Sequence, residues 1–283
     1  MQDAFRYCEE LVRDGDKDRY LAILFAPAKY RRALFALYAF NYEIARVREL
    51  TREAMAGEIR LQWWSEILTG TGRGEISAYP VAAALRDVAV RYALPPQALA
   101  DVIEARRRDL SNQLMPDIAS LETYAARTSS SLMHLAARIL SDGRTPAAAE
   151  FIHHAGISYA FTGLLAAFAI HAARGQLYVP LEVLDRHRAR VEDVHTGKAT
   201  VELRAALAEL RRHARAHLAA AGRCLGDLPA SIMPAVLPIA LVKPTLRRME
   251  RRFYDPFQIV RLPQWRRQWS LWRAARTNLG SAL

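Results

Sequence analysis

Apolar residues recur at spacings of three and four along most of the chain, a pattern typical of helices with one buried face. The clearest example follows Pro27, a residue suited to a first helical turn. One face of this segment carries Tyr30, Leu34, Leu37, Tyr38, Asn41, Ile44 and Ala45. Proline and glycine separate the later helical segments, and no repeat at a fixed period is visible. The pattern predicts an all-α protein.

A long uncharged stretch runs from Ala155 to Ala173, inside a helix that we expect between Pro146 and about Arg174. As a helix, this stretch would nearly cross the hydrocarbon core of a bilayer, which is about 30 Å thick. Its polar residues, and the alanines and glycines that dilute its hydrophobicity, favour a different interpretation. We therefore predict the central helix of a bundle, not a membrane span.

The composition is that of a globular protein, with 283 residues, of which 52% are hydrophobic and 24% are charged. We expect one domain over residues 1–283. Cys8 and Cys224 are the only cysteines in the sequence, which excludes a disulfide framework and a cysteine-rich zinc site. The first residues lack an apolar signal segment, so we expect a cytoplasmic protein.

The formal net charge of +11 indicates an anionic partner. Nucleic acid, an anionic membrane surface and a phosphorylated small molecule are the three classes that compete. Arginine is dispersed along the chain, and the sequence has no zinc-finger spacing, no aromatic RNA-binding motif and no basic-zipper heptads. We therefore expect no nucleic-acid partner.

Several short motifs have an ordinary structural explanation. The glycines of Gly70–Gly74 lack the Lys and Ser/Thr of a phosphate loop and indicate a surface turn. The alternating acids of residues 14–18 do not continue into a calcium loop, so we expect them to approach a helix N-terminus. The hydroxyl run Thr128–Ser131 indicates a close approach of two helices. His213 and His217 have a chelating spacing, but their cationic neighbours favour an exposed helix face.

The C-terminal segment combines tryptophan with arginine, and we expect a helix over residues 262–279. Its stripe at spacings of three and four is Leu262, Trp265, Trp269 and Trp272, and the other sides carry Arg266, Arg267, Arg273 and Arg276. Two interpretations fit this pattern. The tryptophans cap the core, which we favour, or the helix lies in a membrane interface.

Four strings in the first two thirds of the chain belong together. They are YLAILFAPAKYRRALFALYAF, LQWW, YAARTSSSLMHLAARIL and RGQLYVPLEVL, and their order and spacing resemble the squalene/phytoene synthase family. That resemblance implies an isoprenoid-synthase-type helical bundle around a central cavity. Members of the family join two prenyl diphosphates head to head, with Mg²⁺ held by two aspartate pairs spaced DxxxD. Carboxylates four residues apart share one helix face and offer the hard oxygen ligands that Mg²⁺ prefers.

This sequence departs from the family at those aspartate pairs. By alignment of the strings, the first pair falls on Ala45 and Glu49, and the second falls on Ala167 and His171. Two other pairs of carboxylates could each share a helix face, Glu49 with Glu53 and Asp101 with Glu104. They offer at most one of the two metal-binding walls that the chemistry needs. We therefore expect no metal, no cofactor and no catalytic residue.

Later strings resemble one branch of the family more closely. AFNYEIARVRE, RLQWW, TSSSLMHL and LPIALVKPTLRRMERRFYDPF are similar to the branch that contains the mitochondrial complex I assembly factor. The resemblance implies a non-catalytic helper that binds complex I subunits, assembly intermediates, or an isoprenoid or lipid ligand. Its expected place is peripheral, at the inner face of an anionic membrane. The alternative is a Mg²⁺-dependent head-to-head prenyltransferase with an unusual ligand set.

Two groups of candidate residues follow. Those that we expect at the former cavity, as ligand or structural contacts, are Tyr38, Asn41, Arg46, Glu49, His171, Arg174 and Tyr178. Those that we expect at a membrane surface, under the second interpretation of the C-terminal helix, are Trp265, Trp269, Trp272, Arg266, Arg267 and Arg273.

Overall fold

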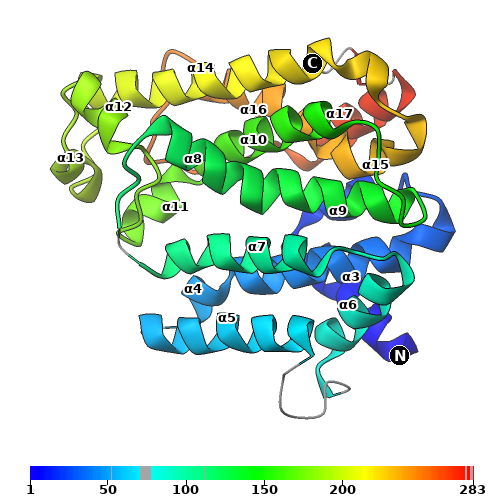
Figure 1. The fold of residues 1–283 in the computed structure, drawn as a ribbon. Coiled ribbons are helices and arrows are strands. Elements are labelled where there is room, and N and C mark those ends of the chain that lie inside the picture. Colours follow the sequence, from blue (N-terminus) through cyan, green and yellow to red (C-terminus); the bar gives the residue numbers. More distant parts are fainter. Residues whose placement is uncertain (52, 71–77, 112, 278, 281–282) are drawn as a thin grey trace. The chain divides into compact units, whose positions relative to one another are not determined.

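Every regular element that the computed structural model assigns is a helix (Figure 1). The structure describes residues 1–51, 53–70, 78–111, 113–277, 279–280 and 283, and no strand occurs within them. The all-α prediction is confirmed. The predicted turn at Gly70–Gly74 lies, from residue 71 onward, outside the described residues.

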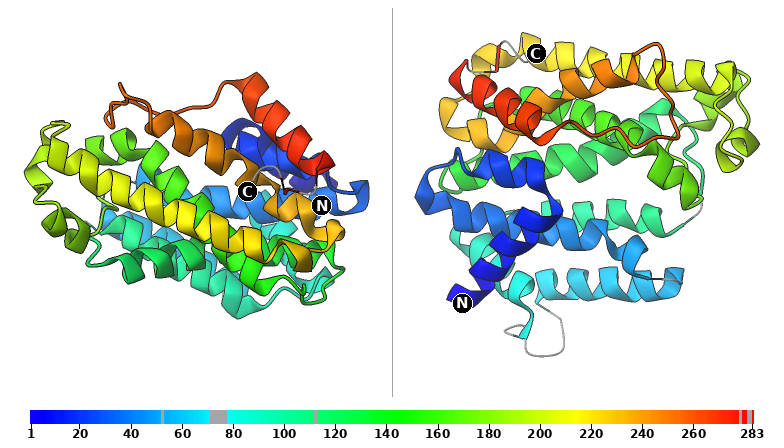
Figure 2. Two further views of the ribbon diagram at one scale, coloured as in Figure 1. Left: turned by 90° about the horizontal axis from the view of Figure 1, so that it is seen from above. Right: turned by 180° about the vertical axis from the view of Figure 1, so that it is seen from behind.

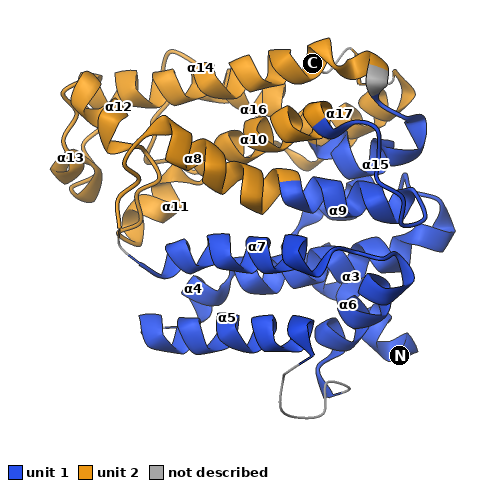
Figure 3. Ribbon diagram, viewed as in Figure 1, with its two compact units in different colours: residues 1–111, 131–149, 228–238 blue, residues 112–130, 150–227, 239–283 orange. Residues whose placement is uncertain are grey.

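Contacts divide the chain into two compact units, each assembled from segments that are far apart in the sequence (Figure 3). Unit 1 consists of residues 1–111, 131–149 and 228–238. Unit 2 consists of residues 112–130, 150–227 and 239–283. The predicted cavity residues before residue 50 belong to unit 1, and those after residue 170 belong to unit 2.

Unit 1 is built around one helix that is buried on most of its sides. Its helices are α1 (Gln2–Gly15), α2 (Lys17–Ile23), α3 (Ala28–Ala45), α4 (Val47–Leu50), α5 (Ala54–Thr69), α6 (Pro80–Arg91), α7 (Pro96–Arg107), α9 (Ser131–Leu140) and α15 (Met233–Val236). α3 contacts α1, α6 and α9, which explains why its apolar residues extend around the helix. Asp16 accepts a hydrogen bond from the amide of Arg19 at 3.2 Å, so the acidic run caps α2 as predicted.

Unit 2 contains the longest helix of the described chain. Its helices are α8 (Ile118–Ala125), α10 (Ala149–Ala166), α11 (Phe168–Ala173), α12 (Leu181–Arg186), α13 (Val191–His195), α14 (Val201–Arg223), α16 (Val242–Met249) and α17 (Gln264–Arg276). The Thr200 hydroxyl begins α14 by accepting a hydrogen bond from the amide of Leu203 at 3.2 Å.

The hydroxyl run lies in a π-helical segment, Ala126–Ser130, that follows α8. Ser130 donates a hydrogen bond to the carbonyl of His153 on α10 at 2.8 Å. One turn further along α10, a Cβ built on Gly156 would overlap the backbone of Ser130. The predicted close approach of two helices through small residues is confirmed.

The uncharged helix differs from its prediction in one respect. It is divided at Ala167, where φ is −95° and ψ is 7°, so that α10 ends at Ala166 and α11 begins at Phe168. α11 ends at Ala173, and Gly175, two residues later, has a φ of +68°, which favours glycine. Among the described residues, no helix is long and apolar enough to cross a membrane.

The interpretation of the tryptophan stripe that we favoured is wrong. On α17, Trp265, Trp269 and Trp272 are 63%, 56% and 43% exposed, whereas Leu271 and Ala274 are buried. The helix packs through its smaller apolar residues and turns the indoles to solvent. It spans Gln264–Arg276, within the predicted 262–279, of which residue 278 is not described.

Candidate functional site

The first group of candidate residues lies where α3 ends, in unit 1. Tyr38 and Asn41 are buried, and burial raises the pKa of Tyr38 to about 12. The guanidinium carbon of Arg19 lies 5.2 Å from the centre of the Tyr38 ring. The buried Oδ1 of Asn41 has no hydrogen-bond partner among the described residues. This end of α3 therefore keeps two buried polar side chains.

The two positions of the family's first aspartate pair lie next along the chain, at Ala45 and Glu49. Ala45 is the last residue of α3, and Glu49 lies on the separate short helix α4. The Nε of Arg46 is 3.4 Å from an Oε of Glu49, and both side chains are 37% exposed. The guanidinium of Arg46 also lies 4.8 Å from the centre of the Tyr42 ring. The remaining carboxylate is thus paired with a cation of its own chain.

The two substitute carboxylate pairs do not provide a metal-binding face either. α4 ends at Leu50 and the backbone at Glu53 is extended, so Glu49 and Glu53 do not share a helix face, contrary to prediction. Asp101 and Glu104 both lie on α7, as predicted. However, Asp101 accepts a hydrogen bond from Gln97 at 2.8 Å, and Glu104 pairs with Arg107 at 2.8 Å.

The second group of candidate residues lies on and after α11, in unit 2. Ala167 occupies the break before α11, and its carbonyl accepts a hydrogen bond from the amide of His171 at 3.1 Å. The His171 ring meets the Tyr178 ring edge-on, with centroids 4.8 Å apart. Arg174 terminates α11. An imidazole in edge-on contact with a phenol stands where the family has a carboxylate.

His171 and Tyr178 line an apolar pocket inside unit 2, and Arg174 does not. Besides these two residues, the lining includes Leu121, Phe161, Leu164, Leu165, Phe168 and Leu210. The Tyr124 ring also packs against Tyr178, with ring centroids 5.6 Å apart. Such a wall suits a hydrocarbon group and offers little to a diphosphate.

The donor set does not fit the Mg²⁺ that the fold family uses. Within the part of the chain that the structure describes, no three His, Cys, Asp or Glu side chains are grouped so that they could hold a metal ion. The four positions that correspond to the aspartate pairs supply two methyl groups, one imidazole and one carboxylate already paired with Arg46. Mg²⁺ binds through several hard oxygen ligands, which these residues do not provide.

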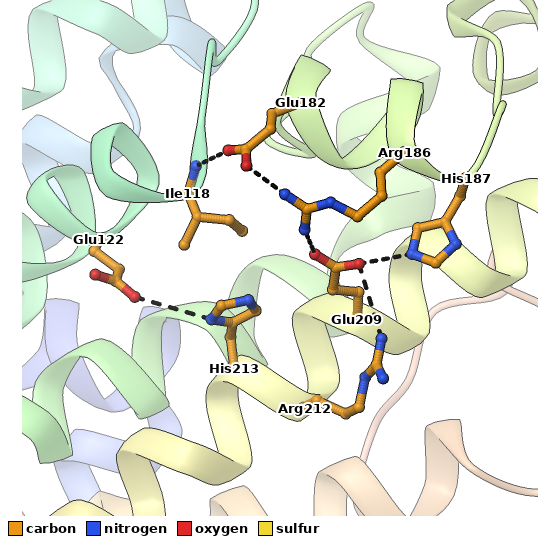
Figure 4. Close-up of polar contacts among 8 residues, drawn as sticks. All are labelled: Ile118, Glu122, Glu182, Arg186, His187, Glu209, Arg212 and His213. Atoms are coloured by element: carbon orange, nitrogen blue, oxygen red, sulfur yellow. Dashed lines mark hydrogen bonds and ion pairs between the residues drawn. The ribbon is translucent and has the colours of Figure 1, made fainter.

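A buried carboxylate that the sequence did not single out organises another part of unit 2 (Figure 4). Glu209, on α14, accepts a hydrogen bond from Nε2 of His187 at 2.7 Å, pairs with Arg186 and lies 3.8 Å from Arg212. Arg186 also pairs with Glu182. Burial raises the pKa of Glu209, but the hydrogen bond from His187 and the charge of Arg186 outweigh it, and the pKa lies below its ordinary value. This network ties α12 to α14.

The histidines of α14 form a second contact group, so the predicted exposed face is wrong for His217. The His217 side chain is 13% exposed, with Nε2 3.1 Å from Glu122 and Nδ1 2.9 Å from Nδ1 of His154. His213 lies 4.0 Å from the same Glu122 oxygen (Figure 4). Burial, with the charge of His217, lowers the pKa of His154. No spacing rule reveals this group, because α8, α10 and α14 are far apart in sequence.

Sequence comparison relates the chain to known proteins over nearly its whole length. The model of the squalene/phytoene synthase family matches residues 12–273. A protein of Rattus norvegicus named NADH dehydrogenase (ubiquinone) complex I, assembly factor 6, is 30% identical over 257 residues, which cover 90% of this chain and 76% of the relative. The chloroplastic phytoene synthase of Narcissus pseudonarcissus is 27% identical over 269 residues, which cover 91% of this chain and 62% of the relative.

A solved structure supports the same fold. The crystal structure of a dehydrosqualene synthase in complex with a ligand superposes with a TM-score of 0.82 at 18% identity. The superposition covers 99% of this chain and 98% of that one. The predicted isoprenoid-synthase-type fold is thereby confirmed.

Proposed function

The chain belongs to the squalene/phytoene synthase family, and on that basis we propose that it acts as a non-catalytic assembly factor for respiratory complex I. Two findings support the proposal. One is the relationship to a protein named as a complex I assembly factor. The other carries more weight, since it concerns this chain itself: Ala45, Ala167 and His171 stand where the fold family places three aspartates.

The chemistry of the family explains why these substitutions matter. Breaking the bond between a prenyl group and diphosphate leaves a highly charged leaving group, which metal ions stabilise. Each missing carboxylate removes ligands that would hold those ions, and Glu49 is engaged by Arg46 at 3.4 Å. We infer that this chain keeps the fold of the family and lacks the carboxylates that hold the catalytic metal ions.

A protein partner and a peripheral membrane location form part of the proposal. Complex I subunits or assembly intermediates are the partners that fit the proposed role, at the inner face of the membrane. The net charge of +11 suits an anionic surface. Affinity capture from solubilised membranes of the native host, with the tagged full chain as bait, would identify the bound subunits by mass spectrometry.

Deletion of the coding sequence in its native host tests the assembly role. We expect membranes of the deletion strain to lose NADH:ubiquinone oxidoreductase activity, and the intact complex to disappear on a native gel. Complementation with the wild-type chain should restore both. A deletion strain with normal amounts of active complex I would refute the proposed role.

A second candidate function is the binding of an isoprenoid or lipid ligand in the apolar pocket of unit 2, whose cavity of about 20 Å³ would have to widen to hold it. Its wall is hydrocarbon on most sides, with His171, Tyr178 and Gln176 as polar groups. Native mass spectrometry of the purified protein should then show a bound apolar molecule. Leu164→Trp would fill the pocket and remove that molecule, whereas the control Leu164→Met conserves side-chain volume and would retain it.

The Mg²⁺-dependent prenyltransferase remains the alternative within the same family. It requires oxygen ligands from residues other than those at the four expected positions. Its distinguishing prediction is the release of diphosphate from a prenyl diphosphate in the presence of Mg²⁺.

A further inference from the structure

A groove in unit 2 lies between α16 and α17, apart from the apolar pocket and the histidine and Glu209 contacts described above. Its walls carry the cationic side chains of Lys243, Arg247 and Arg273, together with Trp269 and Ser270. Figure 2 shows α17 (red) beside α16 (orange). The groove is therefore a concave surface that combines positive charge with an indole.

The sequence around this groove is strongly basic. α16 carries Lys243, Arg247 and Arg248 and no acidic residue. α17 carries Arg266, Arg267, Arg273 and Arg276, again without an acidic residue. Lys243 donates a hydrogen bond to the carbonyl of Leu283 at 3.4 Å, which holds its ammonium group near the groove. The charge of the two helices is complementary to a phosphate.

Trp269 lines the groove, and the other tryptophans of α17 are exposed as it is. Trp269 and Trp272 stack, with ring centroids 5.1 Å apart. The guanidinium carbons of Arg266 and Arg276 lie 5.1 Å from the ring centres of Trp265 and Trp272 respectively. Indole beside guanidinium is the side-chain combination that lies at the boundary between lipid headgroups and acyl chains.

The segment that connects α16 to α17 adds further apolar surface. Phe253 is 89% exposed and Ile259 is 47% exposed. Both side chains belong to the same compact unit as the groove. A soluble phosphate compound would use the cations of the groove and leave these side chains in water.

We propose that the groove between α16 and α17 binds the phosphate of an anionic phospholipid, while the tryptophans of α17 enter the lipid interface. Lys243, Arg247 and Arg273 supply the charge, and Trp269 connects the groove to the exposed indoles. The occupant is a lipid in a membrane, because charge and exposed apolar surface meet at the same place. The proposal rests on the proposed function and names its membrane contact. Vesicle binding is measured without complex I, so the lipid site and the assembly role can each fail without the other.

Vesicle sedimentation with the full chain tests this assignment. We expect binding to vesicles of phosphatidylcholine with phosphatidylglycerol and little binding to phosphatidylcholine alone. Lys243→Gln and Arg247→Gln should each weaken binding by about fivefold, the effect of one basic residue near an anionic surface. Lys198→Gln is the matched control, since it removes an exposed lysine of unit 2 far from the groove in sequence, and it should bind as the wild type does.

Brominated lipids separate the contribution of the indoles. They quench tryptophan fluorescence at contact, so Trp269→Phe and Trp272→Phe should reduce the quenching of the bound protein. Equal losses of binding for Lys198→Gln and Lys243→Gln would overturn the proposal. Binding would then depend on the overall positive charge of the protein and not on the groove. Bound protein without quenching would overturn the proposal, because the indoles would then lie outside the lipid. Binding abolished by inorganic phosphate at constant ionic strength would overturn it in favour of a soluble phosphate ligand.

Discussion

The guanidinium of Arg46 lies 3.4 Å from the carboxylate of Glu49, across the junction between α3 and α4. Glu49 is the one acidic residue at the four positions where the family carries aspartates. A cation of the same chain holds this carboxylate, at the point where α3 has already ended. The pairing suits a structural contact more than a metal ligand.

Glu49→Gln should therefore have little effect. An exposed ion pair contributes about 0–1 kcal/mol to stability, so we expect the free energy of unfolding to change by no more than about 1 kcal/mol. The variant should also restore complex I in the deletion strain. Urea denaturation and complementation check the two expectations, with Arg46→Gln as the reciprocal variant. Loss of complementation with an intact fold would show that Glu49 serves a function.

Glu209→Gln should destabilise unit 2 much more. The carboxylate is 8% exposed and accepts the hydrogen bond from His187 at 2.7 Å, so its neutral replacement leaves buried partners poorly paired. We expect a loss of about 1–3 kcal/mol in the free energy of unfolding. Glu202→Gln, at an exposed position of the same helix, is the control and should change it by less than about 0.5 kcal/mol.

The same carboxylate predicts a dependence of stability on pH. The pKa of Glu209 lies below its ordinary value of 4.5, so folding favours the ionised form. Its contribution is complete well above pH 4.5 and is lost as the pH falls through the pKa of the folded state. Denaturation curves across this range should show that wild type loses its advantage over Glu209→Gln in acid. An advantage that is independent of pH would contradict this assignment.

Gly156→Ala tests the contact between α10 and the π-helical segment. The added Cβ would overlap the backbone of Ser130, which cannot yield as a flexible side chain would. We expect a loss of about 1–3 kcal/mol. Gly163→Ala, on the same helix, meets nothing within 4 Å and should stabilise the protein by about 0.4–1 kcal/mol. Equal effects of the two substitutions would contradict the close packing.

The two cysteines should differ in reactivity toward thiol reagents. Cys8 is fully buried, and burial, with the nearby charge of Glu43, raises the pKa of its thiol to about 12. Because the thiolate is the reactive form, Cys8 should resist alkylation in the native protein. Cys224 is partly exposed and should react first. Mass spectrometry of the alkylated protein, with a denatured sample as control, would locate the label, and rapid native labelling of Cys8 would be the contrary result.

Periodicity predicted helices correctly where one face is apolar and buried, as α14 shows. It could not predict the break at Ala167, since alanine favours a helix and the interruption is a backbone feature with no local signal. It also chose the wrong face of α17. Both the tryptophan stripe and the pair Leu271 and Ala274 are apolar, and periodicity does not tell which of two apolar faces is buried.

The candidate sites depended on a different kind of information. The four degenerate positions were found by resemblance, because a missing aspartate is visible only against a pattern that expects it. The contact of His217 with Glu122 and His154 was missed, since three separate helices supply these residues. Local spacing describes one helix at a time, whereas such contacts depend on tertiary packing.

The release of diphosphate from farnesyl diphosphate or geranylgeranyl diphosphate, measured with the purified full chain and Mg²⁺, tests the central claim most directly. The account predicts release no faster than in a sample without protein, because the chain lacks carboxylates at three of the four positions where the family places aspartates. Release above that background, abolished by chelation of Mg²⁺, would contradict the account and establish a prenyltransferase with other ligands.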